Sequence, residues 1–281
     1  MGAIDAFSKA FSLVSENKSL YVPLLLAMLL LSLFGWAIGL TSLPNHEPVE
    51  KVSGSGSVIF EEYGSVMPEI GEELVAKLLV YLILALIVLS ALQYGVVKGF
   101  KLSLELRDYS LGELISDGIR HAPGVILVNL LGGLLFLVVF AGVALLIVGI
   151  ALVVPPLAVL LGVLMILALL PLAIAYFSIL VPAYVEEGEL SVFVHSLHLV
   201  LRNPLPSMGF GLLMLLFAVA VGIAMAPLTA IAKITTNNGL VVSLIEAPFN
   251  AFIQFYTLAA GLLFYRELAG NGEETPEELF Y

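Results

Sequence analysis

The segment from residue 123 to residue 184 is apolar almost throughout and contains no charged side chain, and this feature constrains the fold most. A hydrocarbon core of about 30 Å is crossed by roughly 20 helical residues. The segment is therefore too long for one membrane-spanning helix and long enough for two. Pro155 and Pro156 supply a break, because proline cannot donate a helical hydrogen bond and restricts the residue before it. We predict two spans, 123–148 and 157–184.

Four further segments are long and apolar enough to cross a bilayer, namely 20–40, 74–97, 204–226 and 240–265. Only 12% of the residues are charged, against about a quarter in a soluble domain, so a soluble fold could not cover this apolar surface. Within lipid the backbone must satisfy its own hydrogen bonds, which leaves helices and closed barrels. The apolar runs lack the alternation of barrel strands. The sequence therefore predicts an all-α, polytopic transmembrane helical bundle of about six spans.

Lysine and arginine residues near the ends of the spans set the predicted orientation, because they favour the cytoplasmic side. With the N-terminus in the cytoplasm, Lys51, Lys77 and Lys233 lie outside. The basic residues that then lie inside are Lys9, Lys18, Lys98, Lys101, Arg107, Arg120, Arg202 and Arg266. An even number of spans returns the C-terminus to the same side. We predict a multi-pass protein of the cell membrane with both termini cytoplasmic and no removable signal peptide.

The acidic residues behind the formal net charge of −11 lie mainly outside the spans. They cluster in a predicted external loop, 41–73, at 186–189, and in an acidic cytoplasmic tail, 267–281. This distribution offers no basic surface, so we expect no nucleic-acid partner. A cation or a partner that reads the loop carboxylates is one alternative, and a plain solvated loop is the more common one. The absence of cysteine excludes disulfides and thiolate chemistry.

A short amphipathic segment precedes every second span, with apolar and polar residues on opposite sides of a helix. The apolar sides are Ile4, Phe7, Ala10, Phe11 and Val14 in the first segment, Leu111, Leu114, Ile115 and Ile119 in the second, and Phe193, Leu197, Val200 and Leu201 in the third. The polar sides include Asp5, Ser8, Lys9, Ser12 and Glu16, then Glu113, Asp117 and Arg120, then Ser191, His195, His198 and Arg202. Each segment is too short to span, so we predict three helices in the cytoplasmic interface with their apolar sides facing lipid.

The first and third amphipathic segments also resemble each other. Residues 6–17 align without gaps with residues 192–203, and both stretches close with an asparagine, Asn17 and Asn203. Asparagine is a common residue at the end of a helix. We predict three tandem, parallel repeats, each an interfacial amphipathic helix plus a transmembrane hairpin. These units are 1–98, 99–184 and 185–266, and the tail follows them.

Residues 6–23 and 181–204 carry a likeness to a known group of proteins. With the spacing of their phenylalanines, prolines and asparagines, they resemble an uncharacterised family of archaeal six-span membrane proteins. That family is similar to the membrane domain fused to some glycerophosphodiester phosphodiesterases. The resemblance implies a six-span helical fold. It implies no functional residues, and no enzymatic activity is expected from it, because the chain has no room for the soluble phosphodiesterase domain.

Four polar residues recur at helical spacing within the sixth predicted span: Glu246, Asn250, Gln254 and Thr257. One side of that helix therefore carries a carboxylate, two amides and a hydroxyl. Lipid tolerates such groups only when they are paired or hydrated. One hypothesis is a polar pathway or substrate site in which Glu246 carries an ion or a proton. The alternative, which is the commoner use of such groups, is hydrogen bonding between neighbouring helices.

Other polar residues have plainer interpretations. Gln93 and Asn129 are candidate partners across the bundle, but single polar residues in spans usually serve helix contacts. His195 and His198 lie close to the acidic residues 186–189 and could approach a metal. No third ligand is fixed by spacing, however, and the polar side of an interfacial helix accepts histidine. We expect no metal site and no cofactor.

The chain lacks the sequence patterns of common catalytic sites, including the nucleophile elbow, the zinc-protease helix and the P-loop. We therefore expect no catalytic residues and a non-enzymatic role in transport, gating or lipid handling. The alternative is a structural or assembly subunit that organises the bilayer or a partner complex, and a lipid-modifying enzyme is a third option. The expected partners are the lipid bilayer and a lipid or small-molecule ligand, and no protein partner is indicated.

Overall fold

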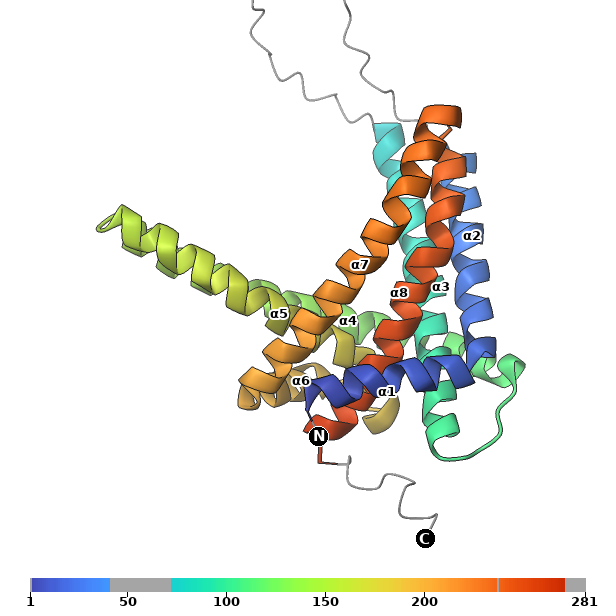
Figure 1. Ribbon diagram of the computed structural model, residues 1–281, viewed down its shortest axis with the longest axis horizontal. Helices are drawn as coiled ribbons and strands as arrows, with labels where there is room; N and C mark the ends of the chain where they lie inside the picture. Colours follow the sequence, from blue (N-terminus) through green and yellow to red (C-terminus); the bar gives the residue numbers. More distant parts are fainter. Residues whose placement is uncertain (1, 41–71, 237, 271–281) are drawn as a thin grey trace, which may run out of the picture.

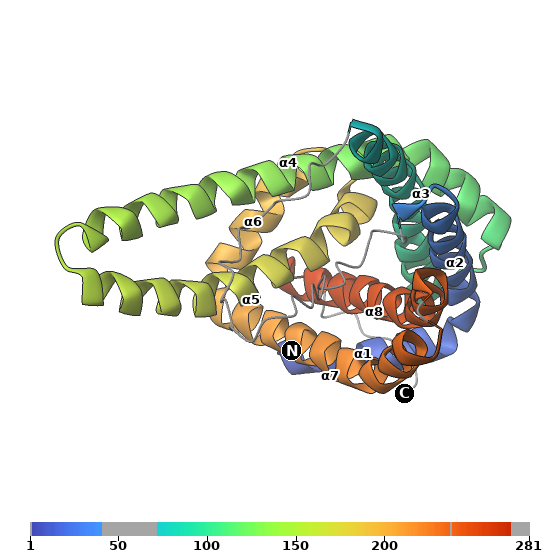
Figure 2. The same ribbon diagram turned by 90° about the horizontal axis from the view of Figure 1, so that it is seen from above.

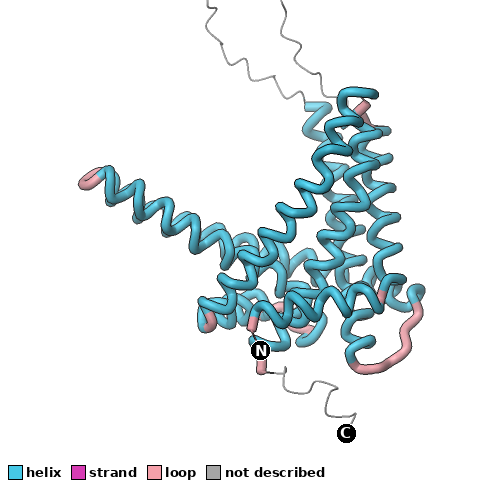
Figure 3. The backbone as a smooth tube through the Cα atoms, in the orientation of Figure 1, coloured by secondary structure: helices cyan, strands magenta, loops and turns pink. Residues whose placement is uncertain are grey.

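The computed structural model describes residues 2–40, 72–236 and 238–270. This part of the chain is all helical, which confirms the predicted fold class for it (Figures 1 and 3). The helices are α1 (Ala3–Glu16), the short 3-10 helix η1 (Lys18–Leu20), α2 (Tyr21–Ala37), α3 (Glu72–Leu104), α4 (Leu111–Ala151), α5 (Pro155–Glu187), α6 (Val192–Arg202), α7 (Pro204–Thr236) and α8 (Gly239–Leu268). Most of the predicted external loop and acidic tail lies outside the described residues.

Six helical segments are long and apolar enough to cross a membrane. Five of them contain a predicted span in full, and the first, Lys18–Ala37, ends three residues before the predicted span 20–40 does. The six segments are η1 with α2, then α3, α4, α5, α7 and α8. The chain is therefore a polytopic helical membrane protein with six candidate spans. The predicted break in the long apolar segment is also confirmed, because α4 ends at Ala151 and α5 begins at Pro155. Proline suits the first turn of a helix, where its missing N–H has no partner to lose.

The first and third amphipathic segments are separate helices, as predicted. Each ends at its asparagine, where the side-chain amide donates to the backbone carbonyl four residues earlier. The distance is 2.9 Å from Asn17 Nδ2 to the oxygen of Leu13 and 3.1 Å from Asn203 Nδ2 to that of Leu199. The same carbonyl groups also accept the backbone N–H of the asparagine, at 3.2 Å for Leu13 and 3.1 Å for Leu199. The chain then turns into α2 and α7.

The prediction of a separate amphipathic helix before the third span is wrong. There α4 runs without a break from Leu111 to Ala151 and passes through Pro123. The segment has no polar stop like Asn17 or Asn203. In addition, one buried stripe, which includes Gly118, Ala122 and Val125, continues from the amphipathic part into the span and packs along α3. Continuous packing on one neighbour holds the helix together across the proline.

The interfacial helices also use their apolar sides differently from the prediction. In α1 the buried residues are Ala3, Ala6, Ala10 and Leu13, which form a narrow stripe where α1 packs against α7 and α8. Ile4 and Phe11 are exposed, as a side that faces lipid requires. The predicted apolar side is therefore divided between protein and lipid, because its small residues allow close contact with α8.

Burial is concentrated at one end of the molecule, which we call the base. The base consists of α1, α6 and the ends of α3, α5 and α8, in which burial is frequent from Ser90, Pro171 and Ala247 onward respectively. Figure 1 shows the described start of α1 and the end of α8 both at the base, as an even number of spans requires. Away from the base α2, α3 and α8 continue side by side and α7 approaches α8, whereas the α4–α5 hairpin leaves the other helices (Figure 1).

The α4–α5 hairpin diverges most and leans away from α7 and α8 (Figures 1 and 2). Between residues 133 and 157 no residue is buried, although large apolar side chains such as Leu137, Phe140 and Leu145 are frequent. Water would not tolerate so large an apolar surface. The hairpin therefore needs a covering of lipid or of another apolar surface.

Candidate functional site

The α8 polar face consists of Glu246, Asn250 and Gln254, which recur every four residues along one side of the helix. The opposite side of α8 packs against α2, where the Tyr21 hydroxyl donates to the Pro248 carbonyl at 2.9 Å. The helix begins at Asn238, whose side chain accepts from the backbone N–H of Leu240 at 2.9 Å. These contacts fix the rotation of α8 and turn the polar face away from α2.

The polar face becomes uncovered because α5 leans away from it. Near the base the same side of α8 touches α5, where a Cβ atom added to Gly261 would lie 2.1 Å from the carbonyl oxygen of Ser178. Gly261 is about two helical turns from Gln254 on this side. Farther from the base α5 departs along the hairpin (Figures 1 and 2), and Asn250 is exposed. Glu246 is partly exposed.

Two acceptors on this face lack a partner within the described residues. The Glu246 carboxylate makes no hydrogen bond or ion pair there, and Oε1 of Gln254 is buried without a donor. Thr257, the fourth predicted site residue, donates its hydroxyl to the Ile253 carbonyl at 2.7 Å and so serves its own helix. Glu246 and Asn250 are therefore accessible on this side of α8, whereas Oε1 of Gln254 is enclosed.

The predicted partners of the polar face do not join it. Gln93 on α3 and Asn129 on α4 are both partly buried, and among the described residues neither forms a hydrogen bond with the face. His195 instead lies 2.7 Å from Oε1 of Glu187, and His198 is exposed. No group of three metal-binding side chains occurs in the part of the chain that the structure describes.

A charged network at the base was missed by the sequence analysis. Glu186 at the end of α5 lies 2.8 Å from Lys101 Nζ on α3 and 2.6 Å from an Arg266 guanidinium nitrogen on α8. Glu105 is 3.8 Å from the same guanidinium. The neighbouring Glu187 accepts the Tyr265 hydroxyl at 2.5 Å. These contacts join the ends of α3, α5 and α8. The opposite charges at these helix ends are the feature of the sequence that could have predicted them.

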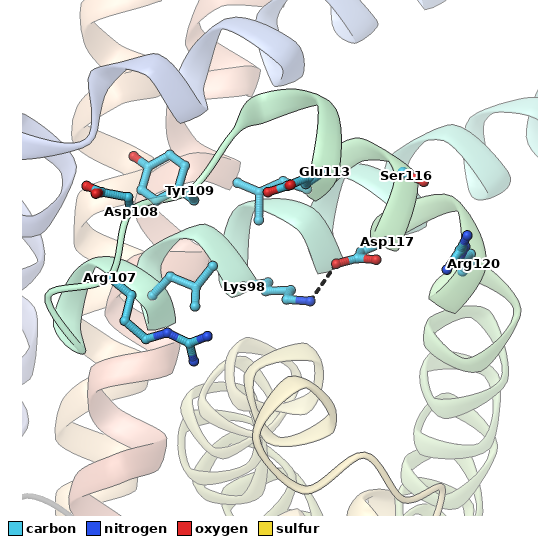
Figure 4. Close-up of a pocket in the computed structure, with 10 residues that line it drawn as sticks. Lys98, Arg107, Asp108, Tyr109, Glu113, Ser116, Asp117 and Arg120 are labelled. Carbon is cyan, nitrogen blue, oxygen red and sulfur yellow. Dashed lines mark hydrogen bonds and ion pairs between the residues drawn. The ribbon is translucent and has the colours of Figure 1, made fainter.

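A second polar region lies where α3 turns into α4, and Figure 4 shows it in close-up. A pocket of about 410 Å³ is lined there by three cationic and three acidic side chains. They are Lys98, Arg107, Arg120, Asp108, Glu113 and Asp117. Lys98 Nζ and Oδ2 of Asp117 are already paired at 2.5 Å. The balanced lining favours no ligand of one charge, so this pocket does not define a site.

Comparisons with protein-family models, curated proteins and solved structures found no match. The resemblance to a six-span archaeal family therefore stays a prediction from residues 6–23 and 181–204. The functional argument rests on the geometry of α8 and its surroundings.

Proposed function

We propose that this chain is a non-enzymatic membrane protein that binds and moves an amphiphilic molecule along the α8 polar face. The observation that carries the proposal is the exposure of Asn250 within a candidate span, next to a Glu246 carboxylate that has no partner among the described residues. Ionisable groups inside a membrane are costly and are retained chiefly where they serve a ligand, an ion or a proton.

The surroundings of the face suit a molecule with a polar head and an apolar tail. The α4–α5 hairpin, which leaves α8 near the base (Figure 2), presents apolar side chains over its uncovered length. A tail can stay among these side chains while the head contacts α8. A fully polar solute would have to lose its hydration in the same place, so an amphiphile is the better ligand.

Access to the face is from the end away from the base. Toward the base the contact between Gly261 and Ser178 closes the space between α8 and α5, and the large side chains of Tyr256 and Phe264, which lie before and after Gly261 along α8, are fully buried. With the orientation proposed from the basic residues, in which both termini are cytoplasmic, a ligand enters from the outer leaflet. Movement toward the other leaflet then requires α5 and α8 to separate.

The three parallel repeats are part of the proposal, and two equivalent hydrogen bonds support them. Tyr256 on α8 donates to the carbonyl of Phe7 on α1 at 2.6 Å, and Tyr176 on α5 donates to that of Phe193 on α6 at 3.0 Å. Phe7 and Phe193 occupy the same position of the repeat. Tyr176 lies on the second span of the second unit, and its partner α6 begins the third unit. Tyr256 lies on the second span of the third unit, and its partner α1 begins the first, so the pattern is the same if the three units form a ring.

A structural or assembly subunit is the second candidate function, and the α4–α5 hairpin is the observation that favours it. A partner helix could cover the apolar side chains between residues 133 and 157, just as lipid could. In that case the α8 polar face would have no ligand, and changes to it would leave the protein's associations intact.

The test is a double substitution, Glu246→Gln with Asn250→Leu, in protein reconstituted into lipid vesicles. Lipid retained after gentle extraction is measured by mass spectrometry, and movement of a fluorescent lipid between leaflets is measured in the vesicles. We expect both to fall by about tenfold, the scale of one lost charge-assisted hydrogen bond. Glu73→Gln, which removes a highly exposed carboxylate at the far end of α3, is the matched control and should change neither. Unchanged retention and movement in the double variant would contradict the proposal.

A further inference from the structure

From the same face, and resting on the proposed function, we infer that the bound head group is a cation that donates hydrogen bonds, namely a primary ammonium on an alkyl chain. The ammonium binds the Glu246 carboxylate beside Asn250, and a further donor reaches Gln254. The juxtaposition that carries this inference is a partly exposed carboxylate, Glu246, and a buried acceptor without a donor, Oε1 of Gln254, on the same side of α8.

The Glu246 carboxylate requires a partner that the described residues do not supply. An ionised carboxylate only accepts hydrogen bonds, and its charge is strongly disfavoured in apolar surroundings unless a cation or water compensates it. In the part of the chain that the structure describes, no lysine or arginine pairs with Glu246. Lys77, a basic residue at the same end of the molecule, is paired with Glu73 at 2.7 Å. A ligand ammonium would offer Glu246 the cation that these residues do not provide.

Gln254 extends the same requirement toward the base. Its Oε1 atom is buried and has no donor, which is unusual for a polar atom in a folded protein. Glu246 and Gln254 are eight positions apart, which corresponds to roughly 12 Å along the helix. Asn250 lies halfway between them and offers both a donor and an acceptor. A head group with an ammonium and a second N–H or O–H donor satisfies this row.

Anionic heads and metal ions fit the face less well. A phosphate would meet the Glu246 carboxylate, and no cationic side chain of the described residues lies on this face to offset the repulsion. A calcium ion needs six to eight oxygen ligands, whereas this face supplies one carboxylate and two amides. A primary ammonium needs only a few acceptors, and its alkyl chain remains in lipid.

The experiment compares three photoreactive probes with the same diazirine-bearing alkyl tail. Their heads are a primary amine, a quaternary ammonium, which has charge without N–H donors, and an alcohol. The full chain is reconstituted into phosphatidylcholine vesicles, and labelling of α8 and α5 is quantified by mass spectrometry. For the unchanged protein we expect the amine to label these helices about ten times more than the alcohol, the scale of a charge-assisted hydrogen bond.

Substitutions on the face connect the preference to particular groups. Glu246→Gln should reduce the ratio of amine to alcohol labelling to about one, whereas Glu246→Asp and the control Glu73→Gln should keep it near ten. Gln254→Leu should leave the ratio near ten, because the simple amine probe carries no second donor to reach a residue roughly 12 Å along the helix. Gel filtration and thermal unfolding of each variant separate a lost head-group contact from a misfolded protein, and the Asp variant keeps the test decisive if the Gln variant does not fold.

The outcomes separate this inference from the proposed function. Equal labelling by amine and alcohol, both abolished by Asn250→Trp, would overturn the cationic head group and leave ligand binding at α8 intact. Labelling that Asn250→Trp does not change would overturn both. If the quaternary probe labels as strongly as the amine, the requirement for N–H donors is wrong.

Discussion

The asparagines that end α1 and α6 occupy equivalent positions in the sequence but make different contacts in the fold. Asn17 is buried, donates to Leu13 and accepts the Tyr109 hydroxyl at 2.9 Å, so it also connects α1 to the segment before α4. Asn203 is partly exposed, and among the described residues its side chain forms the local bond to Leu199. The repeat predicted equivalent ends, and the local bond is indeed shared.

We predict that Asn17→Ala lowers the free energy of unfolding by about 1–3 kcal/mol, because it removes a buried amide and leaves the part-buried hydroxyl of Tyr109 without its closest acceptor. Asn203→Ala should cost less, since it removes only a local bond at a partly exposed site. Reversible unfolding of the two variants in detergent micelles checks this. Equal losses in the two variants would show that the contact with Tyr109 contributes nothing.

At the same scale, the sequence predicts that three polar residues share one side of α8, but it does not predict whether another helix covers that side. The spacing of Glu246, Asn250 and Gln254 was sufficient to place them on one side, since helical periodicity fixes that. Whether another helix covers them depends on the direction that α5 takes after it leaves the base. That direction follows from contacts such as the one between Gly261 and Ser178, which join residues distant in the chain.

Among the elements, α5 and α8 form the contact on which access to the polar face depends. Gly261→Ala should lower stability by about 1–3 kcal/mol and push α5 from α8, because the new Cβ atom would overlap the Ser178 carbonyl. The matched control is Gly222→Ala on α7, where nothing lies within 4 Å and alanine is the better helix former.

The separation of α5 and α8 can be measured directly with pairs of spin labels, because the chain has no cysteine to remove first. Labels on the two helices should move apart in Gly261→Ala and stay in place in Gly222→Ala. An unchanged distance together with unchanged stability in the first variant would mean that α5 does not rest on α8 as the structure indicates.

The ends of α3, α5 and α8 are held together by the Glu186 network. Glu186→Gln leaves Lys101 and Arg266 without their shared anion, so we expect faster amide hydrogen exchange at all three helix ends and a weaker dependence of that exchange on salt. Glu189→Gln is the control, because Glu189 contacts only the exposed Ser191 among the described residues. Faster exchange confined to α5 would contradict a network that joins the three helices.

On the scale of the whole molecule, the membrane character was predictable and the shape was not. Uninterrupted apolar runs fix six candidate spans, since their length must match the bilayer. Hydropathy carries no information about which helices pack together, because lipid covers an apolar side chain as well as protein does. The concentration of burial at the base, the diverging α4–α5 hairpin and the joining of the middle interfacial segment to α4 all arise from such packing.

The most direct test of the account is a photo-crosslinking amino acid at position 250 in the bilayer-embedded protein. The account predicts that it captures lipid or an added long-chain amine, because position 250 is uncovered within the membrane. The same amino acid at position 259, which is fully buried in α8, should capture only protein. Capture of α4, α5 or a partner protein at position 250, with no lipid product, would contradict an open polar face on α8.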